Sequence, residues 1–203
     1  MTTLSFYNRE SQQAELYEQL KAQKSVIGIY GRAGMGKTAL LKQAYVTIQT
    51  QPNYTGVIYL SVNCRPVLTA GTLFKKLATF LPVNHPFNRT YKDVKVSTKN
   101  KTRELLNAMQ GGYYVVCLDN LETMQDAELH YVTDDGIRDF LSALLEMGQN
   151  QPLTVILTSR YLLPFSNTRA LSFPTQHEDN HYPIVIEDGL PIAEALQFMT
   201  DID

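Results

Sequence analysis

The sequence lacks a hydrophobic run long enough to cross a membrane. None of its apolar stretches approaches the roughly 20 residues that a transmembrane helix needs, and its start, MTTLSFYNRE, lacks the apolar core of a signal peptide. Cysteine is scarce as well: Cys64 and Cys117 each follow an apolar, strand-like run. We therefore expect a cytoplasmic protein with no membrane partner, whose two thiols are buried and reduced.

A strong net charge and a metal-binding histidine pattern are also missing. The formal net charge of −2 gives no global reason to expect nucleic acid as a partner. The four histidines (His85, His130, His177 and His181) do not have the spacing of a zinc site. At 203 residues, of which 44% are hydrophobic and 19% charged, the chain is long enough for one α/β domain with a substantial core.

Short apolar runs alternate with helical patterns along the chain. The runs predict five strands, at residues 25–31, 55–64, 113–120, 153–160 and 182–187. Helical spacing of apolar residues predicts helices between them and a closing helix at 192–199, while the polar stretch from Pro82 to Thr98 is expected to be a loop. This alternation predicts a three-layer α/β fold, with a mostly parallel five-stranded sheet and helices on both faces.

The segment YGRAGMGKTALL, residues 30–41, follows the first predicted strand and opens a helix. Gly31, Gly36, Lys37 and Thr38 match the phosphate-loop pattern G-x-x-x-x-G-K-[ST], which specifies a P-loop NTPase fold. Glycines let backbone N–H groups point at phosphate oxygens, next to the positive end of the helix. Lys37 is expected to reach the β- and γ-phosphates and Thr38 to ligate Mg²⁺. The other predicted contacts to the nucleotide in this segment are Arg32, Ala33, Gly34, Met35 and Ala39.

An acidic residue stands at the end of the third predicted strand, in VVCLDN. We expect Asp119 to hold Mg²⁺ through water. Vigorous ATPases of this kind carry a glutamate directly after that aspartate to polarise the attacking water, but this chain has Asn120, whose amide cannot take a proton. Glu122 is a candidate substitute; the alternative is a solvated loop carboxylate. The sequence therefore favours slow hydrolysis.

The fourth predicted strand ends in Thr158, Ser159 and Arg160. If this strand lies beside the first one, Thr158 can hydrogen-bond the γ-phosphate or the attacking water. Arg160 can then detect the γ-phosphate through a forked, charge-assisted contact. These two residues complete the predicted catalytic set with Asp119 and Glu122.

Taken in order, these motifs resemble the STAND group of P-loop NTPases, signalling ATPases that include NB-ARC and NACHT proteins. FYNRES (6–11) resembles their hydrophobic-hydrophobic-Gly-Arg-Glu lead-in with Asn8 in place of glycine, and GRAGMGKT, VVCLDNLE and ILTSR resemble the three motifs that follow. The resemblance implies that Phe6, Tyr7 and Arg9 lie near an adenine, so ATP and ADP are the expected ligands. Gly189–Ile192 resembles a later motif whose proline touches adenine, which makes Pro191 a candidate contact. The segment follows Arg160 too closely for that role, however, and also resembles the strand-to-helix element that precedes this motif.

The resemblance also implies a domain plan and a function. Residues 1–24 would form a lead-in helix and residues 25–203 the P-loop NTPase domain, with the family's helical lid and winged-helix domain absent from this chain. The function implied is a slow nucleotide-dependent switch, in which weak ATPase activity accompanies changes of conformation or of self-association. Sensor and effector domains of a longer protein would be its partners.

Two other functions remain open on the sequence. A small-molecule P-loop kinase would fit the length, and an AAA+-type ATPase acting on nucleic acid would share the lead-in. Both would have to use a basic stretch between residues 89 and 103, the first to hold an acceptor and the second to contact phosphates. The stretch contains no recognisable acceptor site and no aromatic platform beyond Tyr91, and a solvated surface is the alternative interpretation.

Overall fold

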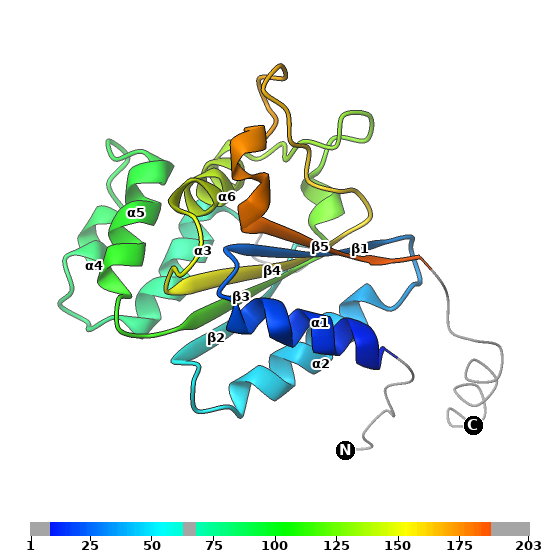
Figure 1. Cartoon of the computed structure of the whole chain (residues 1–203). Helices are drawn as coiled ribbons and strands as arrows, with labels where there is room; N and C mark the ends of the chain where they lie inside the picture. Colours follow the sequence, from blue (N-terminus) through cyan, green and yellow to red (C-terminus); the bar gives the residue numbers. More distant parts are fainter. Residues whose placement is uncertain (1–8, 63–67, 188–203) are drawn as a thin grey trace.

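The computed structural model of the chain describes residues 9–62 and 68–187 (Figure 1). Its described part contains a five-stranded sheet in which all neighbouring strands are parallel. The strand order is β2-β3-β4-β1-β5. The strands are β1 (Val26–Gly31), β2 (Gly56–Ser61), β3 (Tyr114–Asp119), β4 (Leu153–Ser159) and β5 (His181–Ile186). The predicted α/β fold is confirmed.

Helices cover both faces of the sheet, because successive strand residues point to opposite sides. In β1, Ile27 and Ile29 belong to an apolar cluster with α1 (Glu10–Lys21) and α2 (Lys37–Gln49). Val26 and Tyr30 belong to the cluster on the other face, which Figure 1 shows covered by further helices. These are α3 (Ala70–Leu77), α4 (Phe87–Thr90), α5 (Thr98–Ala108) and α6 (Asp135–Met147). Each fully buried large apolar side chain favours the fold by ~1.5–3 kcal/mol relative to an exposed one.

The helix boundaries follow from local side chains. Asp134 precedes α6 and accepts a hydrogen bond of 2.7 Å from the backbone N–H of Ile137, which satisfies one of the free donors of the first turn. Thr69 and Thr72 form a reciprocal capping box at the start of α3. Three short 3₁₀ helices lie between the main elements of the described chain: η1 (Ala78–Phe80), η2 (Leu121–Met124) and η3 (Thr175–Asn180).

The stretch from Pro82 to Thr98 differs from the expected loop. It contains the short helix α4, and α5 already begins at Thr98. The reason is Phe87, which is buried and packs edge-to-face on Phe74 at a ring-centroid distance of 5.9 Å. Phe87, together with the partly buried Tyr91, anchors this largely polar segment to the core.

Cys117 lies buried in β3 as a free thiol, and burial raises its pKa to about 12. Cys64 and the predicted closing helix at 192–199 lie outside the described residues. Within residues 9–62 and 68–187, no helix combines the length and the hydropathy needed to span a bilayer.

The strand order places the predicted functional residues at one edge of the sheet. β4 lies between β1 and β3, and Ile29 of β1 is in register with Thr158 of β4. The carboxyl ends of β1, β3 and β4 therefore meet, which is where open parallel sheets bind their ligands.

Candidate phosphate-binding site

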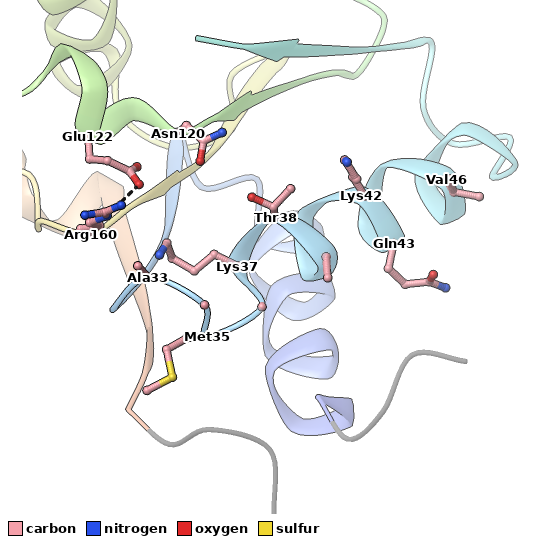
Figure 2. Close-up of a pocket in the computed structure, with 13 residues that line it drawn as sticks. Ala33, Met35, Lys37, Thr38, Lys42, Gln43, Val46, Asn120, Glu122 and Arg160 are labelled. Carbon is pink, nitrogen blue, oxygen red and sulfur yellow. Dashed lines mark ion pairs between the residues drawn. The ribbon is translucent and has the colours of Figure 1, made fainter. Parts of the chain in front are cut away.

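A cavity of about 660 Å³ opens at the carboxyl ends of β1, β3 and β4. Figure 2 shows its walls: the phosphate loop (residues 31–38) and the first turns of α2 on one side, and the residues that follow β3 and β4 on the other. The lining residues are Ala33, Gly34, Met35, Gly36, Lys37, Thr38, Ala39, Lys42, Gln43, Val46, Asn120, Glu122 and Arg160. The predicted phosphate loop, Glu122 and Arg160 are thus brought together around one cavity.

Two glycines of the phosphate loop meet requirements that other residues would not. Gly36 precedes α2 with φ of 82°, a left-handed conformation that L-residues rarely adopt. At Gly31, an added Cβ would lie 2.6 Å from the backbone oxygen of Ile186 in β5. Gly36 therefore lets the loop turn into the helix, and Gly31 lets β1 and β5 approach closely.

Lys37 folds back onto the phosphate loop. Its Nζ donates hydrogen bonds of 2.8 Å and 2.9 Å to the backbone oxygens of Gly31 and Arg32. Burial is the main influence on this amine and lowers its pKa; Arg160 also lowers it, while Glu122 and Asp119 raise it. The lysine is thus held at the cavity wall by weak neutral acceptors, which a phosphate group would outcompete.

Asp119 is buried beneath the cavity with 2% of its surface exposed. Its Oδ1 accepts hydrogen bonds from the hydroxyls of Thr38 (2.9 Å) and Thr158 (2.6 Å), and its Oδ2 accepts one from Tyr59 (2.6 Å). The described residues contain no cluster of three or more His, Cys, Asp or Glu side chains that could hold a metal by themselves. A carboxylate joined to a threonine hydroxyl suits Mg²⁺ arriving with a nucleotide, because Mg²⁺ takes one or two protein oxygens beside phosphates and water.

Thr158 is hydrogen-bonded to Asp119. Its side chain is fully buried, and its Oγ1 donates to Asp119 and accepts a 2.9 Å hydrogen bond from the backbone N–H of Asn120. Its one proton is donated to the carboxylate, and Thr158 is not among the residues that line the cavity. Thr158 thus supports Asp119 in this structure, and its contact with the γ-phosphate or the attacking water stays a prediction.

The residues after β3 and β4 form the wall opposite Lys37. Asn120 lies in the cavity wall with φ of 65°, a left-handed conformation that asparagine tolerates better than most residues. Glu122 lies at the start of η2, and its Oε1 is 3.4 Å from Nε of Arg160. The ion pair is visible as a dashed line in Figure 2. The other carboxylate oxygen of Glu122, Oε2, is buried and has no hydrogen-bond partner among the described residues.

Of the predicted adenine contacts, the structure describes Arg9. It lies immediately before α1 with 8% of its surface exposed, and one of its Nη atoms donates a 3.3 Å hydrogen bond to the backbone oxygen of Met35. Arg9 thus contacts the phosphate loop. Phe6, Tyr7 and Pro191 lie outside the described residues.

Sequence reasoning missed some of the residues at this site. Lys42, Gln43 and Val46 of α2 line the cavity; with Ala39, they recur at helical spacing, so the pattern was there to be found. Tyr59 belongs to no motif.

A second cavity of about 510 Å³ borders Gly31, Arg32 and Arg160 and continues over Leu162 and the end of β5, so Arg160 lies between the two cavities.

The sequence matches the model of the NB-ARC domain family over residues 9–160. A comparison with curated proteins gives no match.

Solved structures resemble the whole described fold. The chain is similar to Drosophila ORC bound to DNA, with a TM-score of 0.64 and 18% identity over 97% of this chain and 47% of that chain. It is also similar to the Aeropyrum pernix ORC2 protein in ADPNP-ADP complexes (TM-score 0.52, 16% identity, 90% of this chain and 48% of that one). AMPPCP-bound DnaA from Aquifex aeolicus is a further match (0.50, 16%, 95% and 50%). The chain spans about half the length of these structures, and the likeness establishes the P-loop ATPase fold.

Proposed function

Because the chain belongs to the NB-ARC domain family, we propose that it is a STAND-type ADP/ATP switch in the cytoplasm, which changes conformation or self-association with the nucleotide bound. An NB-ARC domain is a nucleotide-binding domain related to AAA+ ATPases, and this relation fits the fold described above. The proposal concerns two further properties of the site: whether it distinguishes ATP from ADP, and how fast it hydrolyses ATP.

The residues around the cavity have the chemistry for a Mg²⁺–nucleotide. Backbone N–H groups at the start of α2 and the ammonium group of Lys37 would bind the β- and γ-phosphates. Thr38 and Asp119, already joined at 2.9 Å, would hold the cation. When bound, Mg²⁺ would neutralise phosphate charge. The protein's own part is to keep these groups oriented, through Thr158 and the backbone of β3.

The observation that carries the switch is the ion pair between Arg160 and Glu122 at the cavity wall. Half of the arginine side chain is exposed (52%), whereas Glu122 is 12% exposed, so the arginine is the partner with room to turn. A γ-phosphate in the cavity offers Arg160 a second anion, and ADP does not. Exchange of Arg160 between Glu122 and phosphate would therefore report ATP to the segments after β3 and β4.

Slow hydrolysis is expected from the same wall. Asn120 occupies the position directly after Asp119 and cannot accept a proton. Glu122 is the nearby acid, with one oxygen paired to Arg160 and the other buried without a hydrogen-bond partner among the described residues. An acid held in this way can assist hydrolysis only weakly while Arg160 remains on it.

The two alternatives gain little support. Within the basic stretch, Lys99 and Arg103 are both paired with Glu146, at 2.6 Å and 2.9 Å, and are therefore occupied within the described chain. The Drosophila ORC structure is bound to DNA, but a likeness of fold does not carry a partner across. Salt-dependent retention of the purified chain on DNA would favour the nucleic-acid function instead.

A pair of variants tests the switch. Arg160→Ala should lower the ratio of affinities for a non-hydrolysable ATP analogue and ADP by about tenfold, since charge-assisted hydrogen bonds contribute ~1.5–3 kcal/mol. Glu122→Gln removes the acid but keeps the size, so it should lower the residual hydrolysis rate without lowering that ratio, because Arg160 then has no carboxylate competing with the γ-phosphate. Calorimetric titrations of both nucleotides measure the ratio. An Arg160→Ala protein that prefers ATP as strongly as the wild type would refute the sensing role.

A further inference from the structure

The residues on either side of Arg160 share one hydrogen-bond partner, the side chain of Gln125. Its Oε1 accepts a hydrogen bond from the hydroxyl of Ser159, and its Nε2 donates a long hydrogen bond of 3.4 Å to the backbone oxygen of Tyr161. Gln125 follows directly after η2, the 3₁₀ helix that carries Glu122. One amide thus connects the segment of Glu122 to both chain neighbours of its ion-pair partner, Arg160.

A hydrogen bond within the segment after β4 gives this segment the form of a tight turn. The hydroxyl oxygen of Ser159 accepts a 3.1 Å hydrogen bond from the backbone N–H of Tyr161, a contact between residues i and i+2 that fixes the backbone locally. Ser159 is fully buried, whereas the side chain of Arg160 is 52% exposed. The backbone at Arg160 is therefore held, while its guanidinium group has room to turn.

The amide of Gln125 is itself held by its surroundings. The residue is 8% exposed, its Nε2 donates a 2.8 Å hydrogen bond to the backbone oxygen of His130, and its backbone forms an antiparallel bridge with Val132. The imidazole ring of His130 stacks on the ring of Tyr161, with a centroid distance of 4.1 Å and an interplanar angle of 9°. None of these residues lines the phosphate cavity, so Gln125 can act on a nucleotide only through Arg160.

We propose that Gln125 is a positioning residue, which holds the backbone at Arg160 so that its guanidinium group can reach either Glu122 or the γ-phosphate of ATP. Contacts between a guanidinium group and a phosphate are directional, so they depend on where the arginine backbone lies. Without the amide, the turn would have to be ordered when ATP binds, and this ordering would weaken ATP binding. ADP lacks the γ-phosphate, so its binding should not depend on Gln125. The proposal rests on the proposed function, because it concerns the arginine that distinguishes the two nucleotides.

Gln125→Met is the direct test, because it removes the amide and keeps the length of the side chain. Thr133→Val is the matched control: it removes a 3.0 Å hydrogen bond to the backbone oxygen of Met124, in the same segment, and this contact involves neither neighbour of Arg160. Both substitutions are also made in the Arg160→Ala background. Calorimetric titrations with Mg²⁺ give the Kd of ADP and of a non-hydrolysable ATP analogue for every protein.

We expect Gln125→Met to weaken binding of the ATP analogue by about threefold or more and to leave the Kd of ADP unchanged, whereas Thr133→Val should change neither. In the Arg160→Ala background, Gln125→Met should not alter the ratio of the two constants further, because the residue that it positions is gone. A residue that only stabilised the fold would not produce this pattern. Ser159→Ala, which removes the hydroxyl bound to the amide, should lower the preference for ATP in the same way and replaces Gln125→Met if that protein does not fold.

The proposal is overturned if the tested variant keeps the wild-type ratio, if Thr133→Val lowers the ratio as much, or if the loss is the same in the Arg160→Ala background. In these cases the proposed switch still stands as long as Arg160→Ala alone lowers the ratio. An Arg160→Ala protein with the wild-type ratio, or a wild-type chain that binds neither nucleotide, would instead contradict the proposed function, and the role of Gln125 with it.

Discussion

At the scale of the residue, two cations beside the phosphate cavity are engaged with oxygens of the protein itself. Lys37 donates to the backbone oxygens of Gly31 and Arg32, and Arg160 pairs with Glu122. Both contacts hold the cations near the place where phosphate would bind. A nucleotide then has to displace these partners, but it does not have to order two long side chains from solvent.

Lys37→Ala should weaken ATP binding at least tenfold, about 1.4 kcal/mol or more, because it removes the charge that faces the β- and γ-phosphates. Lys42→Ala is the matched control, since Lys42 lines the same cavity from α2, beyond the phosphate loop. Calorimetry with ATP and Mg²⁺ measures both variants. Equal ATP affinity in Lys37→Ala and wild type would contradict the assignment of the site.

Single residues divide into those that the sequence reveals and those that it does not. The phosphate loop was predictable because its glycines, lysine and threonine must occupy fixed offsets. Asp119 was predictable from its place at the end of an apolar strand. The hydrogen bonds of Tyr59 and Thr158 to Asp119 were not, because both depend on which strands become neighbours.

At the scale of the element, the strands β1 and β5 are joined by a buried polar contact as well as by their backbone. Nε2 of His181 lies 2.8 Å from the hydroxyl of Tyr30, and the ring of Phe165 lies 5.4 Å from the imidazole. Burial lowers the pKa of His181 to about 4 from its ordinary 6.5 and raises that of Tyr30. The pair is therefore neutral in the folded protein at neutral pH.

This contact predicts a pH dependence of stability. Above pH 6.5, His181 is neutral in both the folded and unfolded states and contributes nothing; between 6.5 and about 4, only the unfolded state takes up the proton. The free energy of unfolding should fall as the pH falls through this window, by up to about 1.4 kcal/mol per pH unit. Urea unfolding of wild type and His181→Gln across the window measures it. The variant should lose less stability; parallel curves for the two proteins would contradict the prediction.

Most elements were predictable from periodicity, because a strand buried on both faces is a short apolar run and a surface helix has one apolar stripe. The exception is α4. Its sequence is polar apart from Phe87, and a single aromatic residue gives no periodic signal. Its helical turn depends on the contact with Phe74, so tertiary packing decides its structure rather than local preference.

At the scale of the whole molecule, the chain covers about half of each of the solved structures it resembles. Met35, Ala39, Gln43 and Val46 line part of its cavity. The family resemblance implies that a lid domain supplies part of the adenine pocket. We therefore expect modest affinity for nucleotides in this chain alone, with phosphate contacts contributing most of it.

Adenine should still be preferred over guanine, on the resemblance of FYNRE to an adenine-flanking lead-in and on the contact between Arg9 and Met35. Competition against a labelled adenine nucleotide tests this preference, with unlabelled ATP as the reference competitor. GTP should displace the label less effectively than ATP. Displacement of equal strength would show that the lead-in does not select the base.

The central claim is that the site holds ATP and hydrolyses it slowly, as a switch requires. A single-turnover experiment, with the protein in excess over radiolabelled ATP and Mg²⁺, tests both parts at once, because it follows how much label is retained and how much becomes ADP. With Asn120 beside Asp119 and Glu122 paired to Arg160, we predict only a few turnovers per hour, far below the ~10 s⁻¹ of a typical enzyme. The retained label should therefore still be mostly ATP after several minutes. Retained label that becomes ADP within a second would identify a fast ATPase and contradict the account. A failure to retain any label would contradict it as well.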